Sequence, residues 1–284
     1  MRRYRLYLAA AAILFSTGGA AIKAIHLTAW QVASFRSGIA ALVLLAALPE
    51  SRRGWSWRIA PVAAAYAATL ILFVVANRLT TAANAIFLQS TAPLFILLLA
   101  PLVLHEKIRR GDVLYMLVVL AGVTLFFVGS ETAVATAPDP PRGNAIALAS
   151  GVTYALMLVG LRWLGKRGEG SAALAATTLG NLLAFVCVLP LALPVARAGV
   201  SDLGVLLYVG VIQVGLAYVL LTRGIRHVPA VEATTLLMLE PAMNPFWSWL
   251  VHAERPGALP LTGGAIILVA SAVNTWLRKP DRSA

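Results

Sequence analysis

The chain is a succession of long apolar stretches separated by short polar connections. Each stretch is near 20 residues, the length that an α-helix needs to cross a hydrocarbon core of about 30 Å. Strands of a membrane barrel would instead alternate apolar and polar residues over about 10 positions. The pattern therefore predicts ten membrane-spanning helices, at about 6–25, 28–48, 58–76, 80–104, 112–129, 143–164, 171–193, 203–222, 229–251 and 260–277.

Composition supports the same class of protein. The 284 residues are 60% hydrophobic and 12% charged, whereas soluble domains are about 45–50% apolar and about 25% charged. The longest connection is the Pro-rich SETAVATAPDPPR, so the loops leave no room for a soluble catalytic domain. We expect an all-α integral membrane protein.

The first residues, MRRYRLYLAAAAILFSTGGA, have the basic and apolar layout of a secretory signal peptide. The apolar run continues past Gly19 to Ile25, however, and its removal would leave one span fewer. We therefore expect this segment to remain as the first membrane span.

The net charge of +12 carries information about topology. Of the 23 Lys and Arg residues, 17 fall on the side of the N-terminus and 5 on the other side, with Arg36 inside the second span. The positive-inside rule then predicts cytoplasmic termini in a bacterial inner membrane. The basic residues are scattered through loops and form no continuous basic face, so we expect lipid and a small-molecule substrate as partners, and no nucleic acid.

The chain contains an internal repeat at a constant offset of 148 residues. This offset aligns Pro93 with Pro241, Glu106 with Glu254 and Arg78 with Arg226. Each aligned residue lies in or beside the fourth span of a five-span half. Because five is odd, the halves must enter the membrane in opposite directions, which is the arrangement of many secondary transporters. We expect two five-helix repeats, residues 1–133 and 143–284, joined by a periplasmic linker at 134–142.

These features resemble the drug/metabolite transporter superfamily with its two EamA-type repeats. The resemblance covers essentially the whole chain and rests on the P-x12-E pattern that ends each fourth span, on FSTGGAAIK in the first span and on FRSGIAALVLL in the second. The Trp that the family usually has near Phe15 or Ser16 is absent. Within the superfamily the chain is similar to the bacterial aromatic amino-acid exporters of the YddG type, which implies amino-acid export by a carrier.

A half-polar stripe runs along the fourth span. Helical spacing places Asn84, Phe87 and Thr91 on one side of this helix, while Gln89 points the opposite way. The offset of 148 gives Asn84 an acidic counterpart, Glu232. A polar stripe in lipid must face protein or water. We expect the stripe to line a substrate cavity, the alternative being hydrogen bonds between helices.

Glu240 and the two prolines are the unusual residues of the fourth and ninth spans. Pro93 and Pro241 each remove a backbone donor, so both helices should kink there and act as hinges. A carboxylate at mid-span costs about 2.5–3.5 kcal/mol on insertion scales, which suggests a partner for Glu240. Two interpretations stay open: Glu240 receives a substrate ammonium, or it bonds a neighbouring helix in its protonated form. Gln213 or Asn84 would then receive the substrate carboxylate.

Other residues have weaker signals. Tyr66, Tyr154 and Tyr218 lie within spans and can stack on an aromatic substrate, or they can pack in the core. We expect Lys23 to reach the outer surface by snorkelling. We expect Arg36 to pair or to reach a headgroup, without touching substrate.

Glu106 and Glu254 close their spans, and we expect each to accept bonds from the start of the next helix or from basic groups beside it. The alternative is a role as gates. The two residues are aligned by the repeat, so the same role is expected of both.

We therefore expect a monomeric secondary transporter that exports aromatic or other apolar amino acids by alternating access. Export of drug-like cations or of another metabolite on the same fold is the alternative. A channel or membrane-embedded enzyme is a third possibility, but no P-loop or GxSxG motif occurs and HEKIR lacks the second histidine of a zinc helix. We expect no catalytic residues, no cofactor and no metal.

Overall fold

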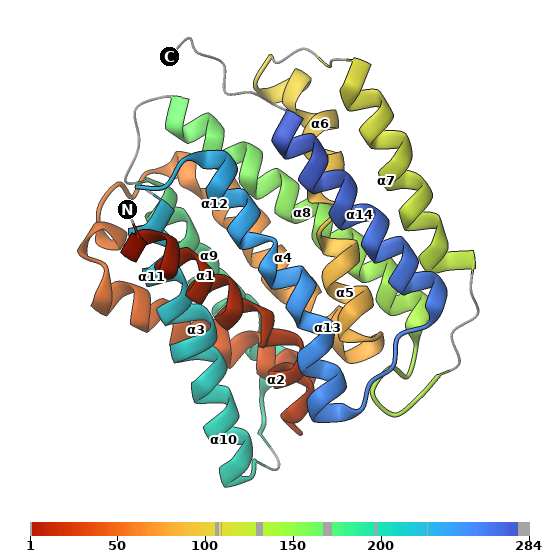
Figure 1. The fold of residues 1–284 in the computed structure, drawn as a ribbon. Coiled ribbons are helices and arrows are strands. Elements are labelled where there is room, and N and C mark those ends of the chain that lie inside the picture. The colour runs from red at the N-terminus through yellow and green to blue at the C-terminus, as the bar shows by residue number, and fades with distance from the viewer. Residues whose placement is uncertain are drawn as a thin grey trace.

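A computed structural model describes residues 2–105, 108, 110–128, 133–166, 172–195, 198–225 and 227–277. These residues form a bundle of helices (Figure 1). The helices are α1 (Arg2–Ser16), α2 (Gly18–Ala24), α3 (Ala29–Ala47), α4 (Ala60–Leu79), α5 (Ala82–Gln89), α6 (Ala92–Val103), α7 (Arg110–Val128), α8 (Pro140–Lys166), α9 (Ala172–Ala192), α10 (Val200–Leu207), α11 (Ala217–Ile225), α12 (Ala230–Leu237), α13 (Leu239–His252) and α14 (Ala258–Leu277), with short 3-10 turns η1 (Pro49–Arg52) and η2 (Trp57–Ile59) and a π-helix, η3 (Tyr208–Leu216).

Nine helical segments of the described residues are long and apolar enough to cross a membrane. They match the expected spans except for the one at 229–251. At that position the chain forms two shorter helices, α12 and α13, separated at Met238. The ten expected crossings thus correspond to nine long apolar segments and one interrupted pair.

The two spans that contain Pro93 and Pro241 are interrupted just before these prolines. α5 ends at Gln89 and α6 begins at Ala92, so Pro93 occupies the first turn of α6. Proline fits that position because the first N–H groups of a helix have no partner within the helix. The hydroxyls of Ser90 and Thr91 donate to the carbonyls of Ile86 and Leu88, at 2.7 and 2.6 Å, and hold the interrupted segment. The kink expected from the sequence is present; the hinge function stays a prediction.

The two halves have the reciprocal arrangement of an inverted repeat. Figure 1 shows α5 leading upward to α6 and α12 leading downward to α13, so these aligned pairs run in opposite directions. Contacts between halves come in matching sets: α4 packs on α8 and α1 on α11, while α3 packs on α9 and α7 on α14. By order within its half, α1 corresponds to α8, α3 to α9, α4 to α11 and α7 to α14. The α4–α8 contact therefore corresponds to the α11–α1 contact, and α3–α9 and α7–α14 each join two corresponding helices. The halves therefore pack on each other through equivalent helices.

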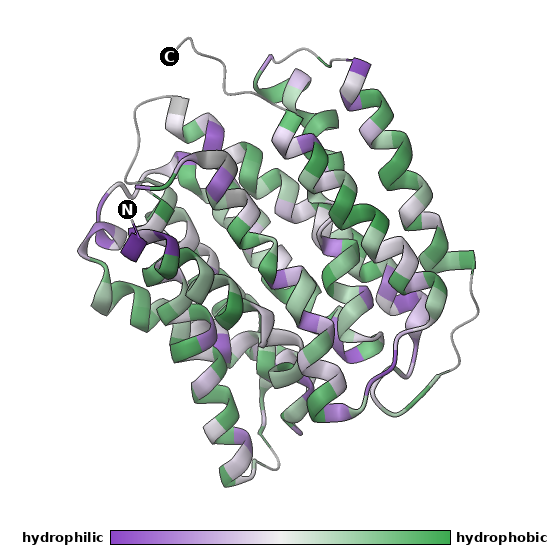
Figure 2. Cartoon of the chain, in the orientation of Figure 1, coloured by the Kyte–Doolittle hydropathy of each residue, from purple (hydrophilic) through white to green (hydrophobic). Residues whose placement is uncertain are grey.

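The outer surface of the bundle is apolar. Figure 2 shows green residues along α7 and α14, where Leu114, Leu117, Leu120 and Val269 are exposed. The single cysteine, Cys187, is also exposed. Such a surface fits contact with lipid chains, in which only helices or closed barrels satisfy their backbone groups.

Candidate functional site

A cavity of about 320 Å³ lies between the two halves. Most of its wall is apolar, and a smaller number of polar groups project into it. The polar and aromatic residues of the lining are Phe15, Arg36, Tyr66, Thr69, Phe73, Gln89, Ser90, Tyr154, Gln213, Tyr218, Glu240 and Ser271. Pockets of this size, apolar with a few polar groups, are typical of small-molecule sites.

The cavity occupies the middle of the bundle, whose inner end is the one that the charge distribution assigns to the cytoplasm. On α8, which starts at the outer end, the lining residues are Tyr154 and Leu158. The lining reaches Leu221 near the inner end of α11, and on the interrupted pair it begins at Leu237. Toward the other end the lining includes Ile86, near the outer start of α5, so the cavity extends from the middle of the bundle toward both ends.

Aromatic side chains form one part of the wall. The hydroxyls of Tyr66 and Tyr218 are 2.5 Å apart, and their rings pack edge to face with centroids 6.0 Å apart. Phe15 packs edge to face on Tyr218 at 5.3 Å. Tyr154 also lines the cavity. An aromatic substrate could pack against these rings edge to face or in an offset stack, which adds to the free energy gained by burying its apolar surface.

Glu240 lies in the first turn of α13 and lines the cavity. The N-terminal end of a helix carries a partial positive charge, which favours a carboxylate there. Among the described residues, Glu240 has no ion-pair or hydrogen-bond partner. Of the two interpretations left open by the sequence, bonding to a neighbouring helix therefore has no contact in its favour.

Gln213 reaches the cavity from the π-helix η3. Such segments widen the helical turn and are frequent at functional sites. Its Nε2 donates to the carbonyl of Phe15 at 3.2 Å, while its Oε1 is buried without a hydrogen-bond partner among the described residues. The unused oxygen is available to a donor in the cavity.

The stripe of Asn84, Phe87 and Thr91 lies elsewhere. None of the three belongs to the cavity lining. Asn84 Nδ2 donates to the Thr80 hydroxyl and to Asn144 Oδ1, both at 3.2 Å, and the Thr91 hydroxyl donates to a carbonyl of its own helix. This is the alternative given above, hydrogen bonding between and within helices. The opposite side of the helix, with Gln89, faces the cavity.

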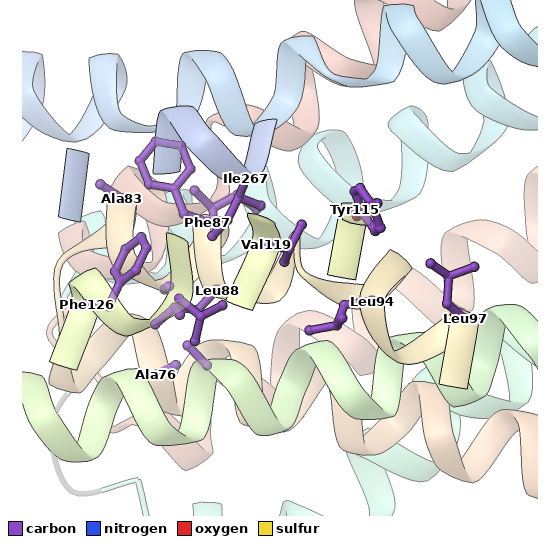
Figure 3. Close-up of a cluster of buried hydrophobic side chains, with 14 residues drawn as sticks. Ala76, Ala83, Phe87, Leu88, Leu94, Leu97, Tyr115, Val119, Phe126 and Ile267 are labelled. Carbon is purple, nitrogen blue, oxygen red and sulfur yellow. The ribbon is translucent and has the colours of Figure 1, made fainter. Parts of the chain in front are cut away.

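Phe87 belongs to a buried apolar cluster between α5, α7 and α14. Its ring packs edge to face on Phe126 with centroids 6.4 Å apart. Figure 3 shows both rings with Ile267 and Val119. A Cβ atom added to Gly264 would lie 2.3 Å from the Phe87 ring, so this packing is tight. Phe87 is a packing residue in this arrangement.

Glu232, the acidic counterpart of Asn84, is near the inner end of the bundle. Its Oε1 is 2.5 Å from Arg5 Nε, and both side chains are partly exposed. It lies in α12 and is absent from the cavity lining. The offset that relates the halves thus places a surface ion pair where a cavity residue was expected.

Tyr66 was considered above for stacking on a substrate, whereas Arg36 and Gln89 are cavity residues that were not expected to bind substrate. Arg36 was expected to pair or to reach a headgroup, whereas it is buried and lines the cavity. A charged residue inside a span is a functional signal in itself, and this signal was available in the sequence. Gln89 carried a similar signal, since it is a polar side chain at mid-span.

The outer end of the bundle is closed by Lys23 and Glu254. Lys23 Nζ is 2.8 Å from Glu254 Oε1 and donates to the carbonyls of Thr80 and Thr136. Glu254 Oε2 accepts the N–H of Ala82 at 2.9 Å, at the start of α5. Lys23 is therefore buried, contrary to the snorkelling expectation, because a carboxylate and two carbonyls replace its water. Glu254 bonds a helix start and a basic group, as expected of a clamp, but both partners belong to the other half and not to the next helix or to an adjacent residue. Glu106 and Arg226 lie outside the described residues.

Comparisons with known proteins agree with this geometry. The sequence model of the EamA-like transporter family matches residues 3–128 and again residues 141–276. The pseudopaline exporters of two Pseudomonas aeruginosa strains are 27% identical over 277 residues, which is 92% of this chain and 91% of each relative. A crystal structure with 19% identity superposes with a TM-score of 0.64 over 98% of this chain and 99% of the other, a likeness of fold.

Proposed function

The chain belongs to the EamA-like transporter family, and we propose that it exports aromatic or other apolar amino acids by alternating access through the central cavity. It is a multi-pass membrane transporter and not an enzyme. Its relative in Pseudomonas exports a small metabolite, pseudopaline. We also propose that both termini lie in the cytoplasm and that the substrate crosses the membrane through the cavity between the two halves.

The observation that carries the proposal is a cavity at the middle of the bundle, between the two halves, with a buried ion pair between the halves at the outer end. Lys23 and Glu254 join the halves at the outer end, so we propose that substrate enters from the cytoplasm and needs a conformational change to leave. Such an arrangement supports a carrier over a channel. The interruptions before Pro93 and Pro241 give the helices places to bend, because backbone bonds are already broken there.

The lining supports an amino acid with an apolar side chain. Tyr66, Tyr154 and Tyr218 surround an apolar wall that fits an aromatic or aliphatic group. Glu240 offers a carboxylate for the ammonium group, and Gln213 offers a buried oxygen to a donor.

The test is counterflow in liposomes. Vesicles that contain the purified protein and unlabelled phenylalanine should accumulate labelled phenylalanine at least tenfold faster than protein-free vesicles. A pH gradient across the membrane is added in a second series, to separate proton coupling from facilitated diffusion. Equal rates in both kinds of vesicle for phenylalanine, tryptophan and leucine would exclude apolar amino acids as substrates.

Export of drug-like cations is the second candidate, and Glu240 favours it because a carboxylate among aromatic rings attracts organic cations. Tetraphenylphosphonium, which has no carboxylate, distinguishes the two. If tetraphenylphosphonium is carried and phenylalanine is not, or if it inhibits phenylalanine counterflow at lower concentrations than unlabelled phenylalanine does, the cation function is the better description.

A further inference from the structure

Arg36 is a buried cation with unused hydrogen-bonding capacity. Its side chain lines the cavity from α3, and the residue is 3% exposed. Nη2 donates to the carbonyl of Leu70 at 3.2 Å, and Nε has no partner. No ion pair of the described residues includes it. A guanidinium without a counter-ion in a low-dielectric site is costly, so a partner is expected at some step of the transport cycle.

We propose that Arg36 binds a carboxylate of the substrate, so that the exported compounds are zwitterions with this group at Arg36 and an ammonium group at Glu240. The inference rests on the proposed function and narrows its substrate class. Arginine suits this role because its planar guanidinium presents several N–H donors that match two carboxylate oxygens at once.

The packing of α3 fixes the position of Arg36. A Cβ atom on Gly210 of η3 would lie 2.6 Å from Ile39 and 3.2 Å from the carbonyl of Arg36, so the two helices are in direct backbone contact. The bond from Nη2 to Leu70 ties the guanidinium to α4. A binding group held on two sides loses little conformational entropy when it binds substrate.

Arg36 and Glu240 line one cavity, and neither has an oppositely charged partner among the described residues. A zwitterion whose charged groups are spaced to reach both residues neutralises both. A simple cation leaves the guanidinium unpaired and is repelled by it, and a simple anion has the same disadvantage at Glu240. Specificity of this kind comes from the penalty imposed on the wrong ligand as well as from the attraction of the right one.

Competition in the counterflow assay tests the proposal. The competitors of labelled phenylalanine are unlabelled phenylalanine, phenylalaninamide, which lacks the carboxylate, and N-acetylphenylalanine, which lacks the ammonium group. With the wild-type protein, phenylalanine should compete at least tenfold better than either derivative, because a charge-assisted bond is lost with each.

Variants then locate the effect. In Arg36→Gln, phenylalanine should compete only about threefold better than phenylalaninamide, or less. It should still compete at least tenfold better than N-acetylphenylalanine. In Arg36→Lys, part of the difference between phenylalanine and its amide should remain. The matched control is Arg52→Gln, because Arg52 also donates to a backbone carbonyl, that of Leu45, but on the exposed surface. The proposal is wrong if phenylalanine exceeds its amide as a competitor by the same factor in Arg36→Gln as in the wild type, or if the two compete equally with the wild type. Neither result would contradict amino-acid transport.

A binding assay covers the case in which phenylalanine is not carried. Thermal unfolding of the detergent-solubilised protein is followed with phenylalanine, citrulline and lysine and with their amides. Compounds with a carboxylate should raise the melting temperature of the wild type by at least 2 °C more than their amides, and Arg36→Gln should abolish the difference. If none does so, the carboxylate site is wrong; if some do while phenylalanine counterflow is absent, only the apolar substrate is wrong.

Discussion

Lys23 and Glu254 form an ion pair that is almost completely buried, with Nζ 2.8 Å from Oε1 and side-chain exposures of 3% and 2%. The pair joins the end of α2 in the first half to the connection between α13 and α14 in the second. Together with the N–H of Ala82, it joins the two halves at the outer end of the bundle. The proposed alternating access requires outward opening to break this pair.

We predict that Glu254→Gln and Lys23→Met each lower the free energy of unfolding by about 3–5 kcal/mol, because each leaves a buried charge unpaired. The double variant should cost much less than the sum, since no charge remains. Denaturant unfolding of the purified protein measures the cycle. As a control, Arg5→Gln and Glu232→Gln break a partly exposed pair and should cost about 1 kcal/mol or less. Additive losses at Lys23 and Glu254 would show that the pair does not act as a unit.

The outer half of α13 carries polar groups that are sealed in the closed state. The Asn244 amide and the Ser248 hydroxyl are buried without hydrogen-bond partners among the described residues, and the amide lies against Gly19. Unsatisfied polar groups in a dry interior are unfavourable. They are explained if water or substrate reaches them when the outer end opens.

We predict that Ser248→Cys, in a Cys187→Ser background, reacts with a membrane-impermeant thiol reagent from the outer side. Adding Glu254→Gln should raise the rate at least tenfold, because the outer end then opens more often. Ala83→Cys, within the buried cluster around Phe87, is the control and should stay unmodified. Protection of Ser248→Cys in both backgrounds would place the outer route elsewhere.

Glu240 and Glu232 allow a matched comparison, since both are glutamates of the interrupted pair α12–α13. Glu240→Gln removes the cavity carboxylate and should lower phenylalanine counterflow at least tenfold, as expected for loss of a charge-assisted bond. Glu232→Gln affects only the pair with Arg5 and should stay within about twofold of the wild type. Equal effects would remove Glu240 from the substrate site.

Gly264→Ala tests the role of Phe87 in packing. The new Cβ atom would lie 2.3 Å from the Phe87 ring, so overpacking should cost about 1–3 kcal/mol. Adding Phe87→Leu should recover part of this loss, while transport per folded molecule changes little. Gly165→Ala, where nothing lies within 4 Å, is the control and should be neutral or slightly stabilising. A change of substrate preference in Phe87→Leu would return Phe87 to the binding site.

Some features of the site could be read from single residues. Pro241 and Pro93 predicted the two helix interruptions, because proline removes an N–H donor from the helix. Pro101, Pro190 and Pro245 lie inside continuous helices, so proline alone did not determine where a helix is interrupted. Glu240, Tyr154, Tyr218 and Gln213 are polar or amphipathic at mid-span, and all line the cavity. Their roles in binding remain predictions.

The side of each helix that meets the cavity could not be read in this way. Asn84 and Gln89 are equally polar and five residues apart, and each bonds α8, through Asn144 and Ser150. Only packing shows that Gln89 also lines the cavity and that Asn84 does not. In lipid, no hydrophobic force separates a helix face that contacts lipid from one that contacts protein. A polar group is satisfied equally well by another helix or by a substrate.

The sequence by itself determined the membrane environment, the membrane spans and the opposite orientation of the two halves. Segment length, charge and backbone chemistry are local properties that act wherever the chain folds. Tertiary structure alone decided that Lys23 meets Glu254 and that Arg36 and Glu240 share a cavity. These residues are far apart in the chain, and their meeting depends on how ten crossings pack. Burial pairs Lys23 with Glu254, whereas Arg36 and Glu240 are without an oppositely charged partner among the described residues.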